Sequence, residues 1–167
     1  MPIKRTLFTS SSIYTIDMSS IKELHERYPK NIFPTVWTHI ESLIQNNQLV
    51  SHIEVQREIK NTNNPQDKLL KWSNKNKKIF LGIDGCQSSQ IPSIQSKYNV
   101  GEWNNKMNRP GPWADPYLLA MAICEDAIII TQESKTKANR IPPIAIQLGL
   151  KPTLNLLELF QELGIRL

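Results

Sequence analysis

Short strand-like runs alternate along the chain with longer helix-like segments. Residues 12–17 alternate apolar and polar side chains and predict a strand. Residues 127–131 form a nearly continuous apolar run, which is typical of a strand buried on both faces of a parallel sheet. Shorter extended pieces are predicted at 49–51 and 144–146, and residues 79–81 are either a strand or the start of a helix.

Apolar residues spaced three or four positions apart indicate where the helices lie. They predict helices over 33–45, 53–59, 66–74, 113–125 and 154–163. Pro116 suits the first turn of its helix, where a missing N–H costs nothing. Residues 84–98 are weakly patterned, and the polar segment 101–111, with its glycines, asparagines and proline, is expected to be an exposed loop.

This alternation of strands and helices predicts a single α/β domain over residues 1–167 with a parallel sheet. A chain of 167 residues can bury one substantial core but is short for two. Its apolar share of 40% and charged share of 21% are those of a globular protein. No run of 18 apolar residues and no secretory signal is present, so we expect a cytoplasmic protein without a membrane span.

The net charge, the cysteines and the histidines limit which partners and metal sites are expected. The net charge of +5 favours a polyanionic partner. Cys86 and Cys124 match no metal-binding spacing, and we expect both to be free thiols in a reducing cytosol. The three histidines lack the HxxxH and HExxH spacings, so zinc catalysis is not expected.

Four acidic residues fall where an α/β sheet places its sites, at the carboxyl ends of strands or on helices nearby. Asp17 and Glu133 follow predicted strands, whereas Glu58 and Asp115 lie on predicted helices. Simpler roles exist for each: Asp17 and Asp115 could cap helices, Glu58 with Glu54 could form a solvated helix face, and Glu133 could be a loop carboxylate. Arg57 is not expected to share that helix face.

Taken together, the four acids favour a metal site. Carboxylates held close together repel one another unless a cation neutralises them. Oxygen ligands without histidine or cysteine suit Mg²⁺ or Mn²⁺. Such an ion can activate water and stabilise charge on a phosphate, which is chemistry suited to cutting a phosphodiester.

Several motifs carry a family resemblance. IYTIDMSS at 13–20, LVSHIEVQREI at 49–59, WADPYLLAMA at 113–122 and IIITQES at 128–134 resemble, in this order, the motifs of PIN-domain nucleases, which include the VapC-type toxins of toxin–antitoxin pairs. YPKNIFPTVW at 28–37, LLKW at 69–72 and RIPPIAIQLGL at 140–150 are similar to a prokaryotic PIN-like branch mostly described as of unknown function.

The resemblance implies a three-layer α/β/α fold with a central parallel sheet, and Mg²⁺- or Mn²⁺-dependent cleavage of RNA. By position, it implies that the catalytic and metal-binding acids are Asp17, Glu58, Asp115 and Glu133. It implies supporting roles for Ser19, Thr131 and Glu54, the last also being an alternative helix ligand. The sequence departs from the family pattern at two places: Met18 replaces the usual threonine, and Glu133 replaces the usual aspartate.

Basic residues near these acids are candidates for RNA binding. They are Lys135, Lys137 and Arg140 after Glu133, and Lys106 and Arg109 before Asp115. Trp103 and Trp113 would be their stacking partners, although both are more typical of a core. A denser run, Lys68, Lys71, Lys75, Lys77 and Lys78, is interpreted as a solvated helix face.

Three functions are compared. The leading hypothesis is an endoribonuclease that acts as the toxin of a type II toxin–antitoxin pair and binds a cognate antitoxin. A homodimer is a further expectation for its assembly. The alternative is a catalytically weak PIN-like module that binds RNA or a protein. A phosphatase of the haloacid-dehalogenase type would need an aspartate where Ser19 stands, and it is set aside.

Overall fold

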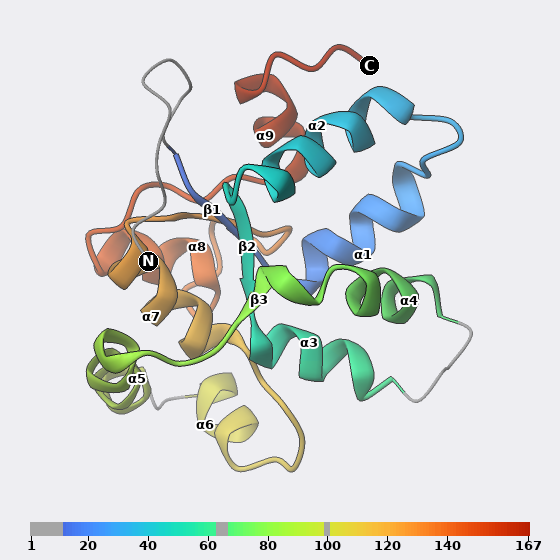
Figure 1. Ribbon diagram of the computed structural model, residues 1–167. Coiled ribbons are helices and arrows are strands. Elements are labelled where there is room, and N and C mark those ends of the chain that lie inside the picture. Colours follow the sequence, from blue (N-terminus) through green and yellow to red (C-terminus); the bar gives the residue numbers. More distant parts are fainter. Residues whose placement is uncertain (1–11, 63–66, 99–100) are drawn as a thin grey trace.

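The computed structural model describes residues 12–62, 67–98 and 101–167 (Figure 1). Strand and helix segments alternate from β1 to β4, and two short helices close the chain. In chain order the elements are β1 (Tyr14–Ile16), α1 (Met18–Arg27), α2 (Pro34–Gln45), β2 (Leu49–His52), α3 (Ile53–Lys60), α4 (Lys68–Lys75), the 3₁₀ helix η1 (Lys77–Ile79), β3 (Phe80–Leu81), α5 (Gly85–Lys97), α6 (Gly101–Met107), α7 (Asp115–Glu125), β4 (Ile128–Ile130), α8 (Ile141–Gln147) and α9 (Leu156–Glu162).

The four strands form one parallel sheet in the order β3-β2-β1-β4. Tyr14 on β1 pairs with Leu49 on β2 and with Ile128 on β4. Because β1 and β4 are neighbours and run in the same direction, their carboxyl ends lie side by side. The predicted parallel sheet is confirmed, and its geometry brings Asp17 next to Thr131.

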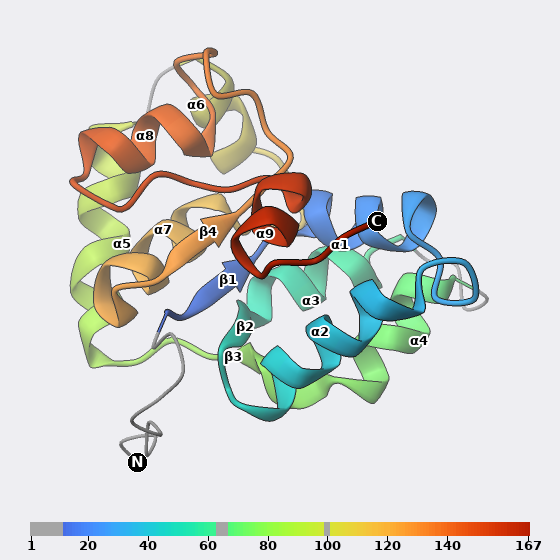
Figure 2. The ribbon, with the colours of Figure 1, turned by 90° about the horizontal axis from the view of Figure 1, so that it is seen from above.

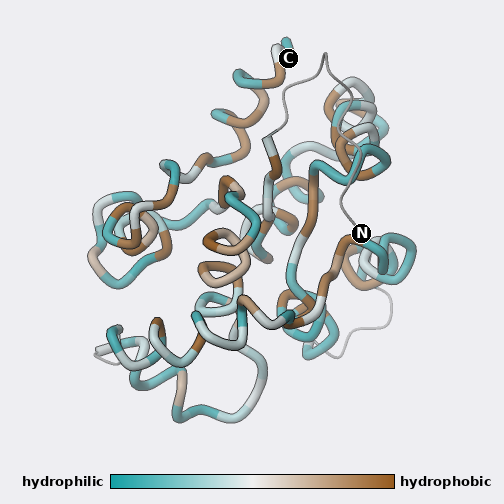
Figure 3. Tube along the Cα trace, turned by 60° about the vertical axis from the view of Figure 1, so that its left-hand side comes forward, coloured by the Kyte–Doolittle hydropathy of each residue, from teal (hydrophilic) through white to brown (hydrophobic). Residues whose placement is uncertain are grey.

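Helices cover both faces of the sheet. Figure 2 shows α5 and α7 on one side of the strands, and α1, α2, α3 and α4 on the other. The residues of β1 and β4 are all buried, as expected for strands packed on both faces. Hydrophobic residues gather along the strands and alternate with hydrophilic ones around the helices (Figure 3). The predicted three-layer α/β/α arrangement is therefore confirmed.

Two predictions of local structure were wrong. The expected extended piece at 144–146 belongs to helix α8. Ile141, Ile144 and Ala145 are buried at helical spacing while Ile146 is 63% exposed, and prolines suit the first turn of α8. The expected loop at 101–111 contains helix α6, which is tied to the core by Trp103, only 2% exposed.

The weakly patterned segment at 84–98 is helix α5, and it forms a disulfide that the sequence did not predict. Cys86 near the start of α5 is bonded to Cys124 near the end of α7, with 6.0 Å between their Cα atoms. The expectation of free thiols was wrong because two residues 38 positions apart meet only once α5 packs along α7. Disulfides are unusual in a reducing cytosol, so the cytoplasmic location stays a prediction. Within the described ranges, no helix is long and apolar enough to cross a membrane.

Candidate metal-binding and nuclease site

Asp17 lies at the carboxyl end of β1 and is also the N-cap of α1. Its Oδ1 accepts a hydrogen bond from the backbone N–H of Ser20 at 2.9 Å, satisfying one of the donors that a helix start leaves free. The side chain is nearly buried, at 5% exposure. The simple capping role and the proposed site role therefore fall on the same carboxylate.

Two hydroxyl groups orient this carboxylate. Thr131 Oγ1, just beyond β4, donates to Asp17 Oδ2 at 2.5 Å. Ser19 Oγ lies 2.8 Å from Oδ1 and 2.9 Å from Oδ2. With the Ser20 N–H these groups supply three protons, and an ionised carboxylate can accept about four. Asp17 is thus fixed in place and keeps about one lone pair for a ligand.

Glu58 is joined to the segment that leads into α7. Its Oε1 accepts the backbone N–H of Ala114 at 2.6 Å, and Ala114 directly precedes Asp115. This contact, between residues 56 positions apart, places the glutamate of α3 beside the start of α7.

Asp115 is the first residue of α7 and does not cap it. Ala114 occupies the N-cap position, and no side chain provides a cap hydrogen bond there. The capping role considered for Asp115 is therefore wrong. A carboxylate in the first turn is still favoured by the partial positive charge of the helix N-terminus.

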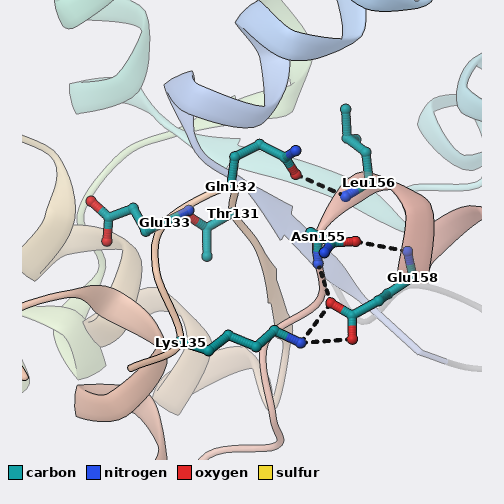
Figure 4. Close-up of polar contacts among 7 residues, drawn as sticks. All are labelled: Thr131, Gln132, Glu133, Lys135, Asn155, Leu156 and Glu158. Carbon is teal, nitrogen blue, oxygen red and sulfur yellow. Dashed lines mark hydrogen bonds and ion pairs between the residues drawn. The ribbon is translucent and has the colours of Figure 1, made fainter. Parts of the chain in front are cut away.

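Glu133 has a structural contact of its own. Its Oε2 accepts the backbone N–H of Ile141, the first residue of α8, at 2.8 Å. Figure 4 shows the side chain pointing to the opposite side of the loop from Lys135. Glu133 therefore helps to hold the start of α8, and one of its oxygens is committed.

The charges of these acids influence one another. Burial raises the pKa of Asp17 to about 6, that of Glu58 to about 7 and that of Asp115 to about 8. After burial, the negative charge of Glu133 is the largest cause for Asp115, and the charges of Asp17 and Glu58 raise its pKa further. The positive charge of Lys106 lowers the pKa of both Glu58 and Asp115. The four acids thus share one electrostatic environment.

A donor set made only of carboxylates has the chemistry that Mg²⁺ and Mn²⁺ prefer. A cation there would also remove the repulsion between partly buried acids. The side chains, however, do not form a finished coordination sphere: across the described ranges, no group of three or more His, Cys, Asp or Glu side chains could hold one ion as it stands. The residues fit the ion in the chemistry of their donor atoms.

The other acid of α3, Glu54, has a different neighbour. It is 8% exposed and forms an ion pair with Arg57 one turn along the helix, so the expectation that these side chains lie on different faces was wrong. Glu58 contacts the segment before Asp115, whereas Glu54 is occupied by Arg57. We therefore keep Glu58 as the candidate ligand.

The sequence did not draw attention to His52, the last residue of β2 and the N-cap of α3. Its Nδ1 accepts the N–H of Glu54 at 3.1 Å, and its Nε2 lies 2.9 Å from Gln87 Oε1. Burial lowers the pKa of the ring, which keeps it neutral, with the proton on Nε2. The only local sign of this capping role was a polar residue between a predicted strand and a predicted helix.

The expected RNA-binding cations have different surroundings. Lys135 forms an ion pair with Glu158 at 2.6 Å (Figure 4), and Arg140 lies 3.4 Å from Glu102. Lys106 lies on α6, with its Nζ 5.7 Å from the centre of the Trp113 ring. Lys137 and Arg109 are exposed. Two of the five cations therefore already have acidic partners.

The chain is similar to one protein family and, at low identity, to two solved structures. No protein with a curated description matches the chain. A crystal structure of PAE2754 from Pyrobaculum aerophilum resembles it with 12% identity, 92% of this chain and 97% of the other being covered, at a TM-score of 0.49. A crystal structure of VapBC2 from Rickettsia felis, bound to a DNA fragment from their promoter, resembles it with 13% identity over 86% and 96%, at a TM-score of 0.48. Residues 14–167 match one family along almost the whole sequence, and the chain belongs to that family, described as a domain of unknown function (DUF4411).

Proposed function

We propose that this chain is a Mg²⁺- or Mn²⁺-dependent endoribonuclease of the PIN type. One observation carries the proposal: hydrogen bonds tie Asp17 to the strand end that precedes Glu133 and tie Glu58 to the residue that precedes Asp115, and the charges of these acids act on one another. Sites of α/β sheets form at this edge. Partly buried acids with raised pKa values in one place are typical of functional sites.

The residues have separable roles in this proposal. Asp17, Glu58 and Asp115 would hold the ion, with Glu133 beside them. When bound, such an ion lowers the pKa of a water molecule and stabilises negative charge on a phosphate. Ser19 and Thr131 keep the Asp17 carboxylate in one orientation. The raised pKa of Asp115 means that a cation bound there would have to displace a proton from its carboxyl group near neutral pH.

The substrate and partners follow from the net charge and the resemblance. A chain with a charge of +5 is suited to a polyanion, and Arg109 and Lys137 are exposed for phosphate contacts. The toxin role, a cognate antitoxin and a homodimer rest on the resemblance to VapC-type toxins alone, because a fold by itself does not determine function.

A second candidate is a catalytically weak PIN-like module that binds RNA or a protein. It is favoured by the incomplete coordination sphere of the described residues. Glu58 and Glu133 each also bind a backbone N–H with one oxygen. Both acids would then serve mainly to join α3 to α7 and to hold α8.

Cleavage of a mixed RNA pool with Mg²⁺ or Mn²⁺ separates the two candidates. Asp17→Asn and Asp115→Asn should each lower the cleavage rate by about a hundredfold or more. Glu26→Gln is the matched control, because Glu26 is an exposed acid on α1. Strong cleavage by both site variants would refute the site. RNA binding by wild type without cleavage under any divalent ion would favour the binding module.

A further inference from the structure

Helix α6 is fastened to the body of the protein beside the acidic site. The Trp103 side chain is buried, and its indole N–H donates to the Asn139 carbonyl at 3.1 Å. Its ring meets that of Trp113 edge to face, with 4.6 Å between the centroids. Trp103 is therefore a core residue, not the stacking platform considered from the sequence, and it holds α6 in a defined position.

Lys106 follows Trp103 by one turn of α6 and lies over Trp113. Its Nζ is 5.7 Å from the ring centroid, within the range of a cation–π contact. Among the residues for which the structure gives positions, no carboxylate lies within ion-pair distance of Lys106. Lys106 is half-buried, and its ammonium group contacts an aromatic ring and not a carboxylate.

Lys106 also borders two hollows of the surface. One has a volume of about 370 Å³ and is lined by residues that include Glu54, Arg109, Trp113 and Tyr117. The other, about 160 Å³, lies between Glu102, Arg109 and Arg140. The larger hollow falls within the volumes typical of small-ligand sites, and Lys106 is one of the residues that line it.

The same lysine lies beside the proposed site acids. Trp113 is followed directly by Ala114, whose N–H binds Glu58, and then by Asp115. The charge of Lys106 acts on both carboxylates. The positive charge of Lys106 thus lowers the pKa values of nearby acids. Because it forms no ion pair with them, its ammonium group can still bind an anion.

We propose that Lys106 is a substrate-positioning residue that contacts a phosphate of the RNA strand next to the acidic site, with Trp113 holding its ammonium group in place. This inference rests on the proposed nuclease function. Lys106 is preferred over Lys135 and Arg140 because those residues are engaged with Glu158 and Glu102. A phosphate there would gain a charge-assisted hydrogen bond without breaking an ion pair.

The test compares Lys106→Gln and Lys106→Arg with Lys97→Gln. Lys97 is the matched control because its Nζ lies over the Tyr98 ring at 5.5 Å, an equivalent contact on another helix. Binding is measured by fluorescence anisotropy, with a single-stranded 2′-O-methyl RNA oligonucleotide that resists cleavage, at several salt concentrations and without divalent metal. Unchanged melting temperatures confirm that the variants fold.

Lys106→Gln should weaken binding roughly fivefold to tenfold for all sequences, and should reduce the slope of log K against log salt by about 0.7, the value for one lost phosphate contact on a single strand. Lys106→Arg should have the affinity and the salt slope of wild type. Lys97→Gln should change neither the affinity nor the salt slope. In cleavage assays, Lys106→Gln should raise KM by a larger factor than it lowers kcat. A purely structural role would not change the salt slope.

An unchanged salt slope for Lys106→Gln, or an equal loss for Lys97→Gln, would overturn the inference while leaving the nuclease proposal intact. A single-stranded DNA oligonucleotide of the same length gives a second comparison. DNA binding that depends on Lys106, in a protein that does not cleave RNA, would support the phosphate contact and refute the ribonuclease. Wild type that binds neither strand would overturn both proposals.

Discussion

The hydroxyl of Thr131 donates a hydrogen bond to the Asp17 carboxylate across 114 positions of sequence. The contact is possible because β1 and β4 are parallel neighbours whose carboxyl ends lie together. Thr131 also accepts the backbone N–H of Glu133. One side chain therefore connects the first and last acids of the candidate site.

Thr131→Val should reduce both activity and metal affinity. Valine has a similar shape but cannot donate to Asp17 or accept the N–H of Glu133. Loss of such a supporting hydrogen bond typically costs about 10- to 100-fold in metal affinity or rate. Mn²⁺ titration and RNA cleavage measure the two effects, with Thr131→Ser as the control that keeps the hydroxyl. A valine variant with wild-type affinity and rate would show that Thr131 has no part in the site.

The stability of the metal-free protein should fall as the pH rises. Folding raises the pKa values of Asp17, Glu58 and Asp115 to between about 6 and 8, from ordinary values near 4. The folded state therefore binds more protons than the unfolded chain between about pH 4 and pH 8, so the free energy of unfolding decreases across this window, by on the order of a few kcal/mol.

Urea unfolding at pH 5 and pH 8.5 in the presence of EDTA measures this change. Asp115→Asn should be about as stable as wild type at pH 5, where Asp115 is protonated, and more stable than wild type at pH 8.5. Adding Mg²⁺ should raise the stability of wild type most at the higher pH. Equal stability of wild type at both pH values would contradict the shared acidic environment.

Reduction of the disulfide should destabilise the protein. The bond between Cys86 and Cys124 closes a loop with a sequence separation of 38, for which the chain-entropy estimate is on the order of 3 to 4 kcal/mol. Thermal unfolding with and without a dithiol reductant measures the loss. The double variant Cys86→Ser/Cys124→Ser should be as stable as the reduced protein and should not respond to the reductant. Two titratable thiols in the native, unreduced wild type would refute the pairing.

His52→Leu should lower the free energy of unfolding by about 1 to 3 kcal/mol, because it leaves the Glu54 N–H and the Gln87 side chain without their partner. His52→Asn keeps a capping oxygen and should lose less. Since His52 begins the helix that carries Glu58, the leucine variant should also cleave RNA more slowly. Chemical unfolding and RNA cleavage rates of the two variants test this. A His52→Leu variant as stable as wild type would exclude the role of His52 as the cap of α3.

Local sequence patterns were sufficient for the elements that position the acids. Asp17 after an alternating run and Glu133 after an apolar run are both recognisable because strands and their ends leave a periodic signal. The helix over 113–125 is confirmed as α7 with a start two residues later. The hydrogen bonds that join Glu58 to Ala114 and Glu133 to Ile141 link residues through tertiary structure, and no local pattern encodes them.

Two of the remaining errors share this cause, and the third does not. Helix α6 is polar over most of its length, and its one buried tryptophan becomes meaningful only against Trp113. Cys86 and Cys124 lie on different helices, and only the packing of α5 along α7 brings them together. The residues 144–146 are apolar enough for a strand, and the two prolines before them were the local evidence for a helix start.

Asp17 both caps helix α1 and carries a negative charge. The substitution Asp17→Asn separates these two roles. An asparagine at this position keeps an oxygen to accept the Ser20 N–H, so α1 can still begin there, but it has no negative charge for a cation. Substitutions that remove the cap as well would risk the fold. If the proposed function holds, a nuclease and an inactive binding module of this architecture can therefore differ by one conservative substitution.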